Sequence, residues 1–353
     1  MFDADKSAKL SWLALVSCPR QRGSIQTKSD IVELAGSFYV DSQRSPMSDP
    51  LPSRAAKLLN ILDLKKIEEN LYQGENETEN GARLFGGQVL AQASAAAYRT
   101  VDKVHLHSLH AYFLRPGRVD RPVLYEVERV RDGRSFVTRR IVAIQNGQAI
   151  FNMDASFQAA ELGLEHSAPM PNVPPPRELR EDVEVARELG GPQADPRMSP
   201  MAKADRPFHL RSVFELGSKA WGEDRFWNPT WIKFREAATL PQPIEDPEEA
   251  AFREQALARC LVAYASDMGL VSTAVLPHQS GIDRNEVQMA SLDHSLWIHR
   301  AVPVDQWFLF HKRTSTAQSS RGMVHSEFFS ESGDLVASMS QEGLLRKRRG
   351  DEQ

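Results

Sequence analysis

Asp267 is the residue of this 353-residue chain whose surroundings most clearly suggest acid–base chemistry. It follows Ala263-Tyr264-Ala265 in an otherwise apolar helical stretch and precedes Gly269. A carboxylate in such surroundings loses hydration, so its pKa should rise toward the range of a general base or a water-orienting group. A buried aspartate that caps a neighbouring helix or turn explains the pattern equally well.

Ser291 and Gln341 are further polar candidates, although an ordinary structural role explains each of them better when it is taken alone. The Ser291 hydroxyl could hold a water molecule, and the Gln341 amide at the end of the last predicted strand could both donate to and accept from one. Asp293 and His294 beside Ser291 suggest a serine-hydrolase triad. However, Ser291 lies in no Gly-x-Ser-x-Gly motif, and adjacent strand residues point to opposite faces of a sheet.

Gly86 and Gly87 open an Ala-rich helical stretch and could bring backbone N–H groups close to a ligand carbonyl or phosphate. Tight packing of a helix against a strand explains a glycine pair equally well. The sequence contains no P-loop and no complete Gly-x-Gly-x-x-Gly motif. His105, His107 and His110 are spaced as on a strand, so packing is favoured over metal binding. We therefore expect no metal and no cofactor.

The composition excludes several classes of protein. A net charge of −4 gives no basic footprint for nucleic acid. Two cysteines, Cys18 and Cys260, suggest a reduced compartment and no disulfide framework. The longest apolar stretch, 257–276, is interrupted by Arg259 and Asp267, so no bilayer span is expected.

Residues 1–54 are interpreted as an N-terminal extension outside the main fold. The apolar run 10–18 resembles an export signal, but it is short and Asp3 and Asp5 do not suit the basic flank of such a signal. Met47 is a candidate for the true start of the protein. We expect a cytoplasmic location.

The remaining chain shows two similar halves, 55–165 and 206–346, joined by a Pro-rich connection at 166–205 and followed by a charged tail at 347–353. An amphipathic helix is predicted at 55–71, and further helices are predicted at 85–97 and from 248 to 267. Strands are predicted at 106–114, 122–130, 135–145, 149–158, 208–216, 230–235, 295–302, 307–312, 322–329 and 335–341. Asn146-Gly147 is a strong hairpin signal, and Ser332-Gly333 marks the corresponding turn of the second half.

The two halves also match in the order of their predicted elements and in local sequence. The stretch 107–113 aligns with 294–299, and 145–150 aligns with 331–336. A small-residue helix followed by antiparallel strands is typical of a helix wrapped by a sheet, which is the hotdog fold. We therefore predict an α+β double hotdog, in which edge-to-edge joining of the two sheets covers exposed strand edges.

A series of motifs between about Leu58 and Arg346 resembles acyl-CoA thioesterase II. The motifs occur in the same order along the chain as in that family. The motifs that carry the resemblance are Leu84–Gln88, His107–Gly117, Arg131–Phe136, Ala143–Gly147, Tyr264–Asp267, Leu292–Arg300 and Ser340–Gly343.

The resemblance implies direct hydrolysis of fatty acyl-CoA thioesters by a water molecule. The family's trio of Asp, Thr or Ser, and Gln matches Asp267, Ser291 and Gln341. Ser291 stands where bacterial relatives commonly have Thr, so we expect looser positioning of the hydroxyl. In the repeat alignment, the first-half position that corresponds to Gln341 lies near Ala155, so the first half lacks the trio and is expected to be structural. The tail does not end in a Ser-Lys-Leu-type signal.

Further binding residues are assigned from the same resemblance. The substrate would contact Gly86 and Gly87, and Arg321 is a candidate for the CoA phosphates. His107 is a candidate near the site, with a packing role favoured. A homodimer or homotetramer is expected. A hotdog enoyl-CoA hydratase and a non-catalytic acyl-CoA-binding protein are the alternatives.

Overall fold

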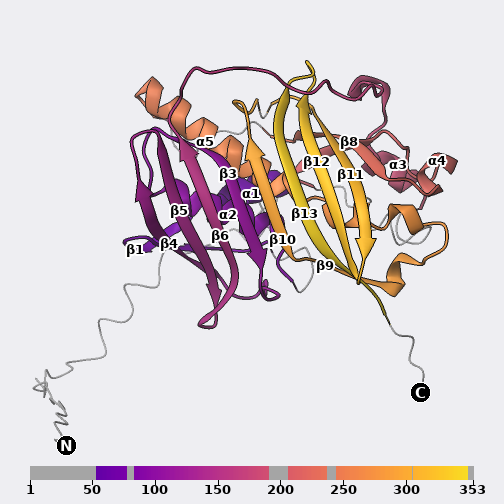
Figure 1. Cartoon of the computed structure of the whole chain (residues 1–353), viewed down its shortest axis with the longest axis horizontal. Helices are drawn as coiled ribbons and strands as arrows, with labels where there is room; N and C mark the ends of the chain where they lie inside the picture. The colour runs from indigo at the N-terminus through magenta and orange to yellow at the C-terminus, as the bar shows by residue number, and fades with distance from the viewer. Residues whose placement is uncertain (1–52, 78–82, 191–205, 237–243, 304, 349–353) are drawn as a thin grey trace, which may run out of the picture. The chain divides into compact units, whose positions relative to one another are not determined.

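The computed structural model describes residues 53–77, 83–190, 206–236, 244–303 and 305–348 (Figure 1). The chain divides after Leu51, and every described residue lies in the part that follows. The predicted extension 1–54 therefore lies almost wholly outside the described residues, as do the Met47 start and most of the tail 347–353.

One antiparallel sheet runs through the described part of the chain, in the order β1-β2-β4-β5-β6-β3-β10-β13-β12-β11-β8-β7, with β9 paired to β13. The strands of the first half are β1 (Lys65–Glu68), β2 (Leu71–Gly74), β3 (His105–Phe113), β4 (Val123–Asp132), β5 (Phe136–Gln145) and β6 (Gln148–Gln158). Those of the second half are β7 (Phe208–Ser212), β8 (Trp227–Phe234), β9 (Val287–Ser291), β10 (Asp293–Ile298), β11 (Phe308–Gln318), β12 (Arg321–Ser330) and β13 (Leu335–Lys347).

The two halves join through β3 and β10, which pair antiparallel with Leu109 directly opposite Leu296. These two leucines are also equivalent in the repeat, since 107–113 aligns with 294–299. The pseudo-twofold axis relating the halves therefore passes through this pair. Both side chains are fully buried. The predicted double hotdog and the covering of the inner sheet edges are confirmed.

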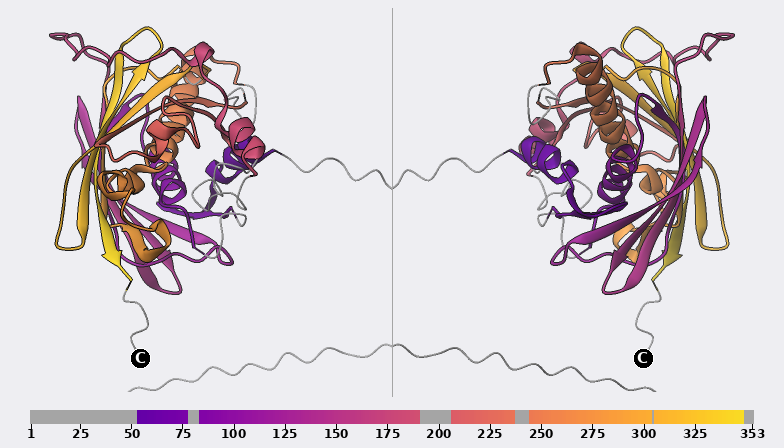
Figure 2. Two further views of the ribbon diagram at one scale, coloured as in Figure 1. Left: turned by 90° about the vertical axis from the view of Figure 1, so that its right-hand side faces the viewer. Right: turned by 90° about the vertical axis from the view of Figure 1, so that its left-hand side faces the viewer.

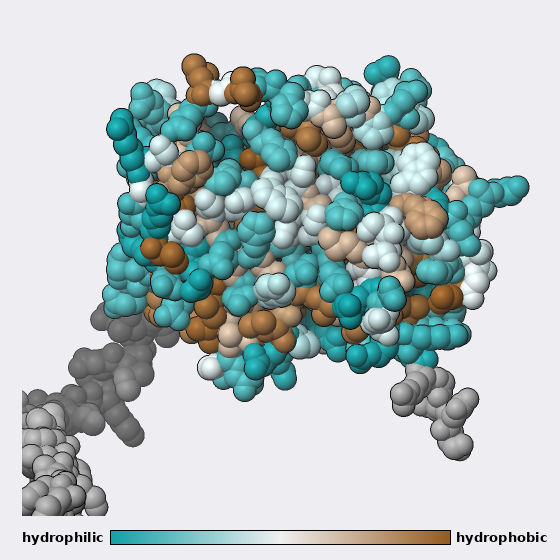
Figure 3. Space-filling view, in the orientation of Figure 1, coloured by the Kyte–Doolittle hydropathy of each residue, from teal (hydrophilic) through white to brown (hydrophobic). Residues whose placement is uncertain are grey.

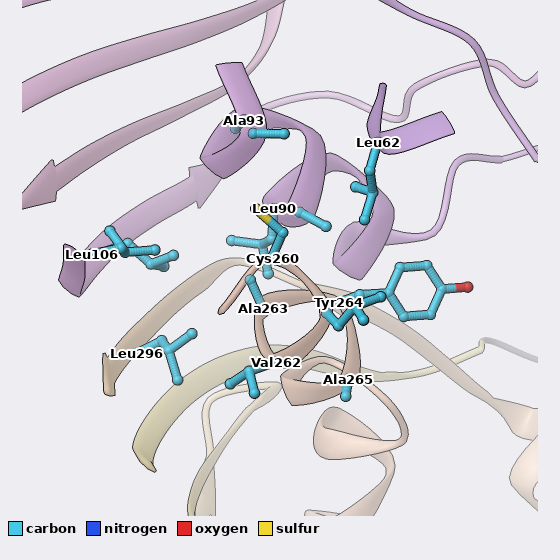
Figure 4. Close-up of a cluster of buried hydrophobic side chains, with 14 of the residues drawn as sticks. Leu62, Leu90, Ala93, Leu106, Cys260, Val262, Ala263, Tyr264, Ala265 and Leu296 are labelled. Carbon is cyan, nitrogen blue, oxygen red and sulfur yellow. The ribbon is translucent and has the colours of Figure 1, made fainter. Parts of the chain in front are cut away.

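The main helices lie on one face of the sheet, as the edge-on views show (Figure 2). They are α1 (Arg54–Leu62), α2 (Gly86–Tyr98) and α5 (Pro247–Ser266), accompanied by the short helices α3 (Asp182–Glu188), α4 (Lys219–Gly222) and α6 (Leu270–Thr273) and by 3-10 turns at Pro176–Glu178, Leu276–His278 and Arg284–Glu286. Alanines on α2 and α5 let these two helices pack closely between the halves (Figure 4).

Several element boundaries differ from the sequence prediction. The helix predicted at 55–71 ends at Leu62, and β1 and β2 follow, joined by a turn in which Asn70 has φ +58°. The strand predicted at 208–216 ends at Ser212. The last strand continues to Lys347 because its distal half pairs with β9, a strand that the sequence pattern did not predict.

The Pro-rich connection crosses the outer face of the second half. Its residues Met170, Val173 and Leu179 pack against a buried cluster that includes Trp231, and the Trp231 indole N–H donates to Pro174 O at 2.9 Å. Buried residues therefore point to both faces of β8. The outer face seen in Figure 3 is largely hydrophilic with scattered apolar patches, as expected for an antiparallel sheet whose other face is packed.

The stretch Pro247–His278 is long and apolar enough to cross a bilayer, contrary to the sequence expectation. Most of its apolar window is buried within the protein, and α5 packs against α2 and the sheet. Core helices of globular proteins pass the same test of length and composition. The packing therefore identifies this stretch as a core helix.

We predict that Leu296→Ala, at the axis of the sheet, lowers the free energy of unfolding by about 2–5 kcal/mol, because it removes fully buried side-chain atoms and leaves a cavity. Denaturant unfolding measures the change. Trp297→Ala, on the more exposed face of the same strand, is the matched control. An equal loss in both variants would contradict the central role of the Leu109–Leu296 pair.

Candidate active site

The candidate site forms where the N-terminus of α2 meets the C-terminus of α5. A methyl group at Gly87 would lie 2.3 Å from Tyr264 O, and one at Gly86 would lie 2.7 Å from Asp267 Oδ2. Only glycine allows this approach. The glycine pair therefore serves tight packing and also places backbone N–H groups beside a carboxylate.

Asp267 caps α5 and is almost fully buried. Its Oδ1 accepts a hydrogen bond from Gln341 Nε2 at 2.8 Å and a longer one from Ser291 Oγ at 3.4 Å. The Gly87 backbone N–H also donates to the carboxylate. The structure thus brings together Asp267, Ser291, Gln341 and the glycine pair, five of the seven residues that the sequence analysis singled out.

Burial raises the pKa of Asp267 to about 6, while the hydrogen bonds from Gln341, Gly87 and Ser291 oppose that rise. Desolvation penalises the charged form, whereas each donor stabilises it. The carboxylate is therefore mostly ionised at neutral pH and still basic enough to take a proton. This balance suits a general base.

Gln341 lies in the middle of β13 and is fully buried, so its predicted position at the end of the last strand is wrong. The amide nitrogen holds Asp267, and Oε1 has no hydrogen-bond partner in the described part of the chain. A buried amide oxygen of this kind can accept a hydrogen from a water molecule that also faces Asp267.

Ser291 ends β9, and β10 begins two residues later along the same edge of β13. Ser291 is opposite Gly343, whereas Ser295 is opposite Ser340, so the register shifts by one residue between Ser291 and Ser295. This irregularity turns Ser291 toward Asp267. The 3.4 Å separation is long for an O–H···O bond.

His294 supports the same helix end from the neighbouring strand. Ser266 Oγ donates to Ala263 O, so the His294 Nε2–H must donate to Ser266 Oγ at 2.9 Å. Burial lowers the pKa of His294 to about 3, so the ring is neutral. Asp293 instead accepts from the Glu342 N–H. The two adjacent residues thus serve separate contacts, as the alternation of strand faces predicts.

The other two predicted binding residues contact side chains outside this group. His107 Nε2 is 2.8 Å from Ser156 Oγ, and its ring packs against Phe136. This is the packing and hydrogen-bonding role favoured from the sequence. Arg321 begins β12 and forms a 2.9 Å ion pair with Glu342 at a half-exposed position.

A cavity of about 530 Å³ opens beside the site. Phe85, Tyr264 and Met268 form part of its wall, so it reaches the immediate chain neighbours of Gly86 and Asp267. The Tyr264 hydroxyl donates to Glu77 Oε2 at 3.2 Å, and Phe85 packs edge-on against the Tyr264 ring. These contacts fix part of the cavity wall. Phe85 and Tyr264 belong to motifs quoted from the sequence, but the cavity itself was not predicted.

The first half has no counterpart of Gln341. Ala155 is opposite Leu109, and Met339 is opposite Leu296, so Ala155 corresponds to Met339 across the axis. Two residues further on, Phe157 corresponds to Gln341. Phe157 is fully buried and packs edge-on against Tyr98. The first-half counterpart of Gln341 is therefore Phe157 and not a residue near Ala155. An apolar ring fills that position.

Family models match both halves of the chain. The model described as acyl-CoA thioesterase N-terminal domain matches residues 76–158, and the model described as acyl-CoA thioesterase matches residues 241–344. A relative named acyl-CoA thioesterase 2, from Haemophilus influenzae, is 34% identical over 82% of this chain and 96% of its own length. A mouse relative named acyl-coenzyme A thioesterase 8 is 35% identical over 88% of this chain and 95% of its own.

Solved structures agree with these relationships. The acyl-CoA thioesterase II TesB2 of Mycobacterium marinum has a TM-score of 0.64 and 34% identity, and the match covers 84% of this chain and all of that one. A hot dog protein of unknown function from Alicyclobacillus acidocaldarius has a TM-score of 0.63 at 18% identity over 83% of this chain and 99% of its own, which shows the fold alone.

We predict that Asp267→Asn stabilises the protein more at pH 7.5 than at pH 4. The folded-state pKa of about 6 lies above the ordinary value of 3.8, so ionisation of Asp267 weakens the fold. The stabilisation of the fold that comes from this raised pKa is complete below pH 3.8 and is lost as the pH rises through 6. The difference corresponds to about 3 kcal/mol.

Denaturant unfolding of both proteins across this pH range measures the effect. Subtracting the wild-type curve from that of the variant removes the titration of all other groups. A difference that stays constant between pH 4 and 7.5 would show that the pKa of Asp267 is not raised in the folded protein.

Proposed function

Since this chain belongs to the acyl-CoA thioesterase II family, whose members hydrolyse acyl-CoA thioesters, we propose that Asp267, Gln341 and Ser291 activate the attacking water molecule. The observation that carries this proposal is the buried Asp267 carboxylate, held by Gln341 Nε2 at 2.8 Å, next to the unpartnered Gln341 Oε1. The Asp267 carboxylate and Gln341 Oε1 can therefore both accept hydrogens from one bound water molecule.

In the proposed reaction, a water molecule donates one hydrogen to Asp267 and the other to Gln341 Oε1. Asp267 removes its proton as the water oxygen bonds to the thioester carbon. The carbon–sulfur bond then breaks, and the CoA thiolate takes the proton from Asp267. A thiolate is a good leaving group, so the reaction requires no separate strong acid.

The N-terminus of α2 supplies the electrostatic stabilisation in this proposal. Its partial positive charge faces the space beside Asp267, where the thioester oxygen becomes negative. The Gly87 N–H is already engaged with Asp267, so it orients the base and is not the oxyanion donor. We assign the backbone N–H of Gly86, at the open end of the helix, as the donor to the oxyanion.

Ser291 has a supporting role. Its hydroxyl reaches the same oxygen of Asp267 as Gln341, but at 3.4 Å. It keeps the carboxylate oriented with a weaker contact, which is consistent with the looser positioning expected when serine replaces threonine.

The geometry gives less support to the alternatives. A hydratase needs a histidine that acts together with the acid, but the His294 ring donates to Ser266, and no hydrogen bond joins it to Asp267 in the described structure. A non-catalytic binding protein has no need for a buried carboxylate whose pKa is raised to about 6. We therefore propose hydrolysis.

We predict that Asp267→Ala lowers kcat for acyl-CoA hydrolysis by about 10²–10⁴-fold, because the reaction loses its general base. A thiol-release assay across acyl-CoA chain lengths measures the rate. Asp154→Ala is the control, since this carboxylate is exposed on the first half of the sheet and pairs with Arg140. Wild-type turnover by Asp267→Ala would remove the base assignment, and no turnover by the unmodified protein at any length would overturn the enzymatic function.

A further inference from the structure

Two adjacent polar residues of β10, Asp293 and His294, take no part in the proposed reaction. His294 is fully buried, and Asp293 is half-buried. In the described part of the chain, neither side chain forms a hydrogen bond with Asp267, Ser291 or Gln341. Each one instead contacts the residue that directly precedes or follows a member of this trio. Any influence on the reaction therefore passes through those neighbours.

His294 holds the end of α5 through Ser266. The His294 Nε2–H donates to Ser266 Oγ at 2.9 Å, and that hydroxyl donates to Ala263 O at 2.8 Å, so the chain of hydrogen bonds ends on the last turn of the helix. Both Ser266 and His294 are fully buried. The next residue is Asp267, which caps the helix. A shift of this turn would therefore move the carboxylate directly.

Asp293 holds β13 at the residue that follows Gln341. Its Oδ1 accepts a hydrogen bond from the Glu342 N–H at 2.8 Å, and the Leu292 N–H donates to Glu342 O at 3.0 Å. At this point β9 and β10 carry one residue more than the facing stretch of β13, so the regular ladder is interrupted. The Asp293 carboxylate takes the place of the missing backbone acceptor. The side chain thus fixes the backbone next to Gln341.

Both contacts start from one strand that is held on two sides. β10 pairs with β3 along one edge and with β13 along the other. Neighbouring residues of a strand have a fixed separation and point in different directions. The two contacts therefore set the end of α5 and the middle of β13 relative to each other, and these elements carry Asp267 and Gln341.

The contact that this arrangement controls is the 2.8 Å hydrogen bond from Gln341 Nε2 to Asp267 Oδ1. That bond opposes the burial that raises the pKa of Asp267 to about 6. Misalignment of the two elements would remove a donor from the carboxylate and would displace Gln341 Oε1, which is assigned to the water molecule. A displacement of about 1 Å between reacting groups can lower a rate by about 10²-fold.

The cost of burying His294 argues against a role in packing alone. Its Nδ1 is buried and has no hydrogen-bond partner among the residues that the structure describes. An apolar side chain of similar size would avoid this cost. The hydrogen bond from Nε2 to Ser266 is the one contribution that an apolar side chain could not supply.

We infer that Asp293 and His294 are positioning residues, which hold Gln341 and Asp267 in the relative placement that water activation requires. This role rests on the proposed function and deepens it, because it names the residues that set the geometry of the trio. Neither side chain is expected to contact the substrate, so the loss of either contact should lower kcat and leave KM nearly unchanged.

The test compares variants that remove each contact with variants that keep it. Asp293→Ala and His294→Leu remove the acceptor and the donor, and should lower kcat for acyl-CoA hydrolysis by about 10- to 100-fold, with KM within about 2-fold of the wild type. Asp293→Asn and His294→Gln keep an oxygen and an N–H at similar reach and should retain kcat within about 3-fold. Ser295→Ala is the matched control, since it removes the 3.0 Å contact with His110 from the same strand and should leave kcat unchanged.

The pH profile separates positioning from general destabilisation. The acidic limb of kcat/KM reports the Asp267 base, whose pKa of about 6 is set by burial and by the donors Gln341, Gly87 and Ser291. Displacement of Gln341 removes a donor, so the limb should move upward by about one pH unit in Asp293→Ala. Asp293→Asn, which also removes the titration of Asp293 itself, should leave the limb in place.

Wild-type kcat in both Asp293→Ala and His294→Leu would overturn the assignment while leaving hydrolysis intact. Equal losses in the conservative variants, or an acidic limb that stays at its wild-type position in Asp293→Ala, would also overturn it, because neither result depends on the two hydrogen bonds. A melting temperature close to that of the wild type shows that each variant folds. Hydrolysis at the wild-type rate by Asp267→Ala would instead contradict the proposed function itself.

Discussion

The close approach of two helix ends is the constraint on which the site depends. The backbone of α2 begins against Tyr264 O of α5, at a separation that leaves no room for a side chain on Gly87. This contact buries Asp267 and also supplies it with a backbone donor. The same feature therefore raises the pKa of the carboxylate by desolvation and limits that rise by hydrogen bonding.

The pseudo-twofold axis at Leu109 and Leu296 explains why a symmetric scaffold carries an asymmetric site. Each half contributes a helix and a set of strands, but only the second half provides a buried amide in the middle of its last strand. In the first half Phe157 occupies the equivalent position. That half contributes the N-terminus of α2, so both halves are needed for one site.

The sequence predicted features that depend on local patterns. The helix that begins at the glycine pair, the Asn146-Gly147 hairpin and the repeat were all predicted correctly, because periodicity and turn residues determine them. The position of Gln341 within its strand was not predicted, since β13 extends past it by pairing with β9, which is distant in sequence. The cavity beside the site was not predicted for the same reason, because its wall combines β8, β11 and the segment around Asp182.

The central claim is that Asp267 activates water and does not itself attack the thioester. A single turnover in ¹⁸O-labelled water, with enzyme in excess over acyl-CoA, tests it most directly. Mass spectrometry of the released fatty acid and of the peptide that contains Asp267 locates the label. Direct water attack predicts one ¹⁸O atom in the fatty acid and none in the peptide. Label in the Asp267 peptide would show a covalent acyl-aspartyl intermediate and contradict the account.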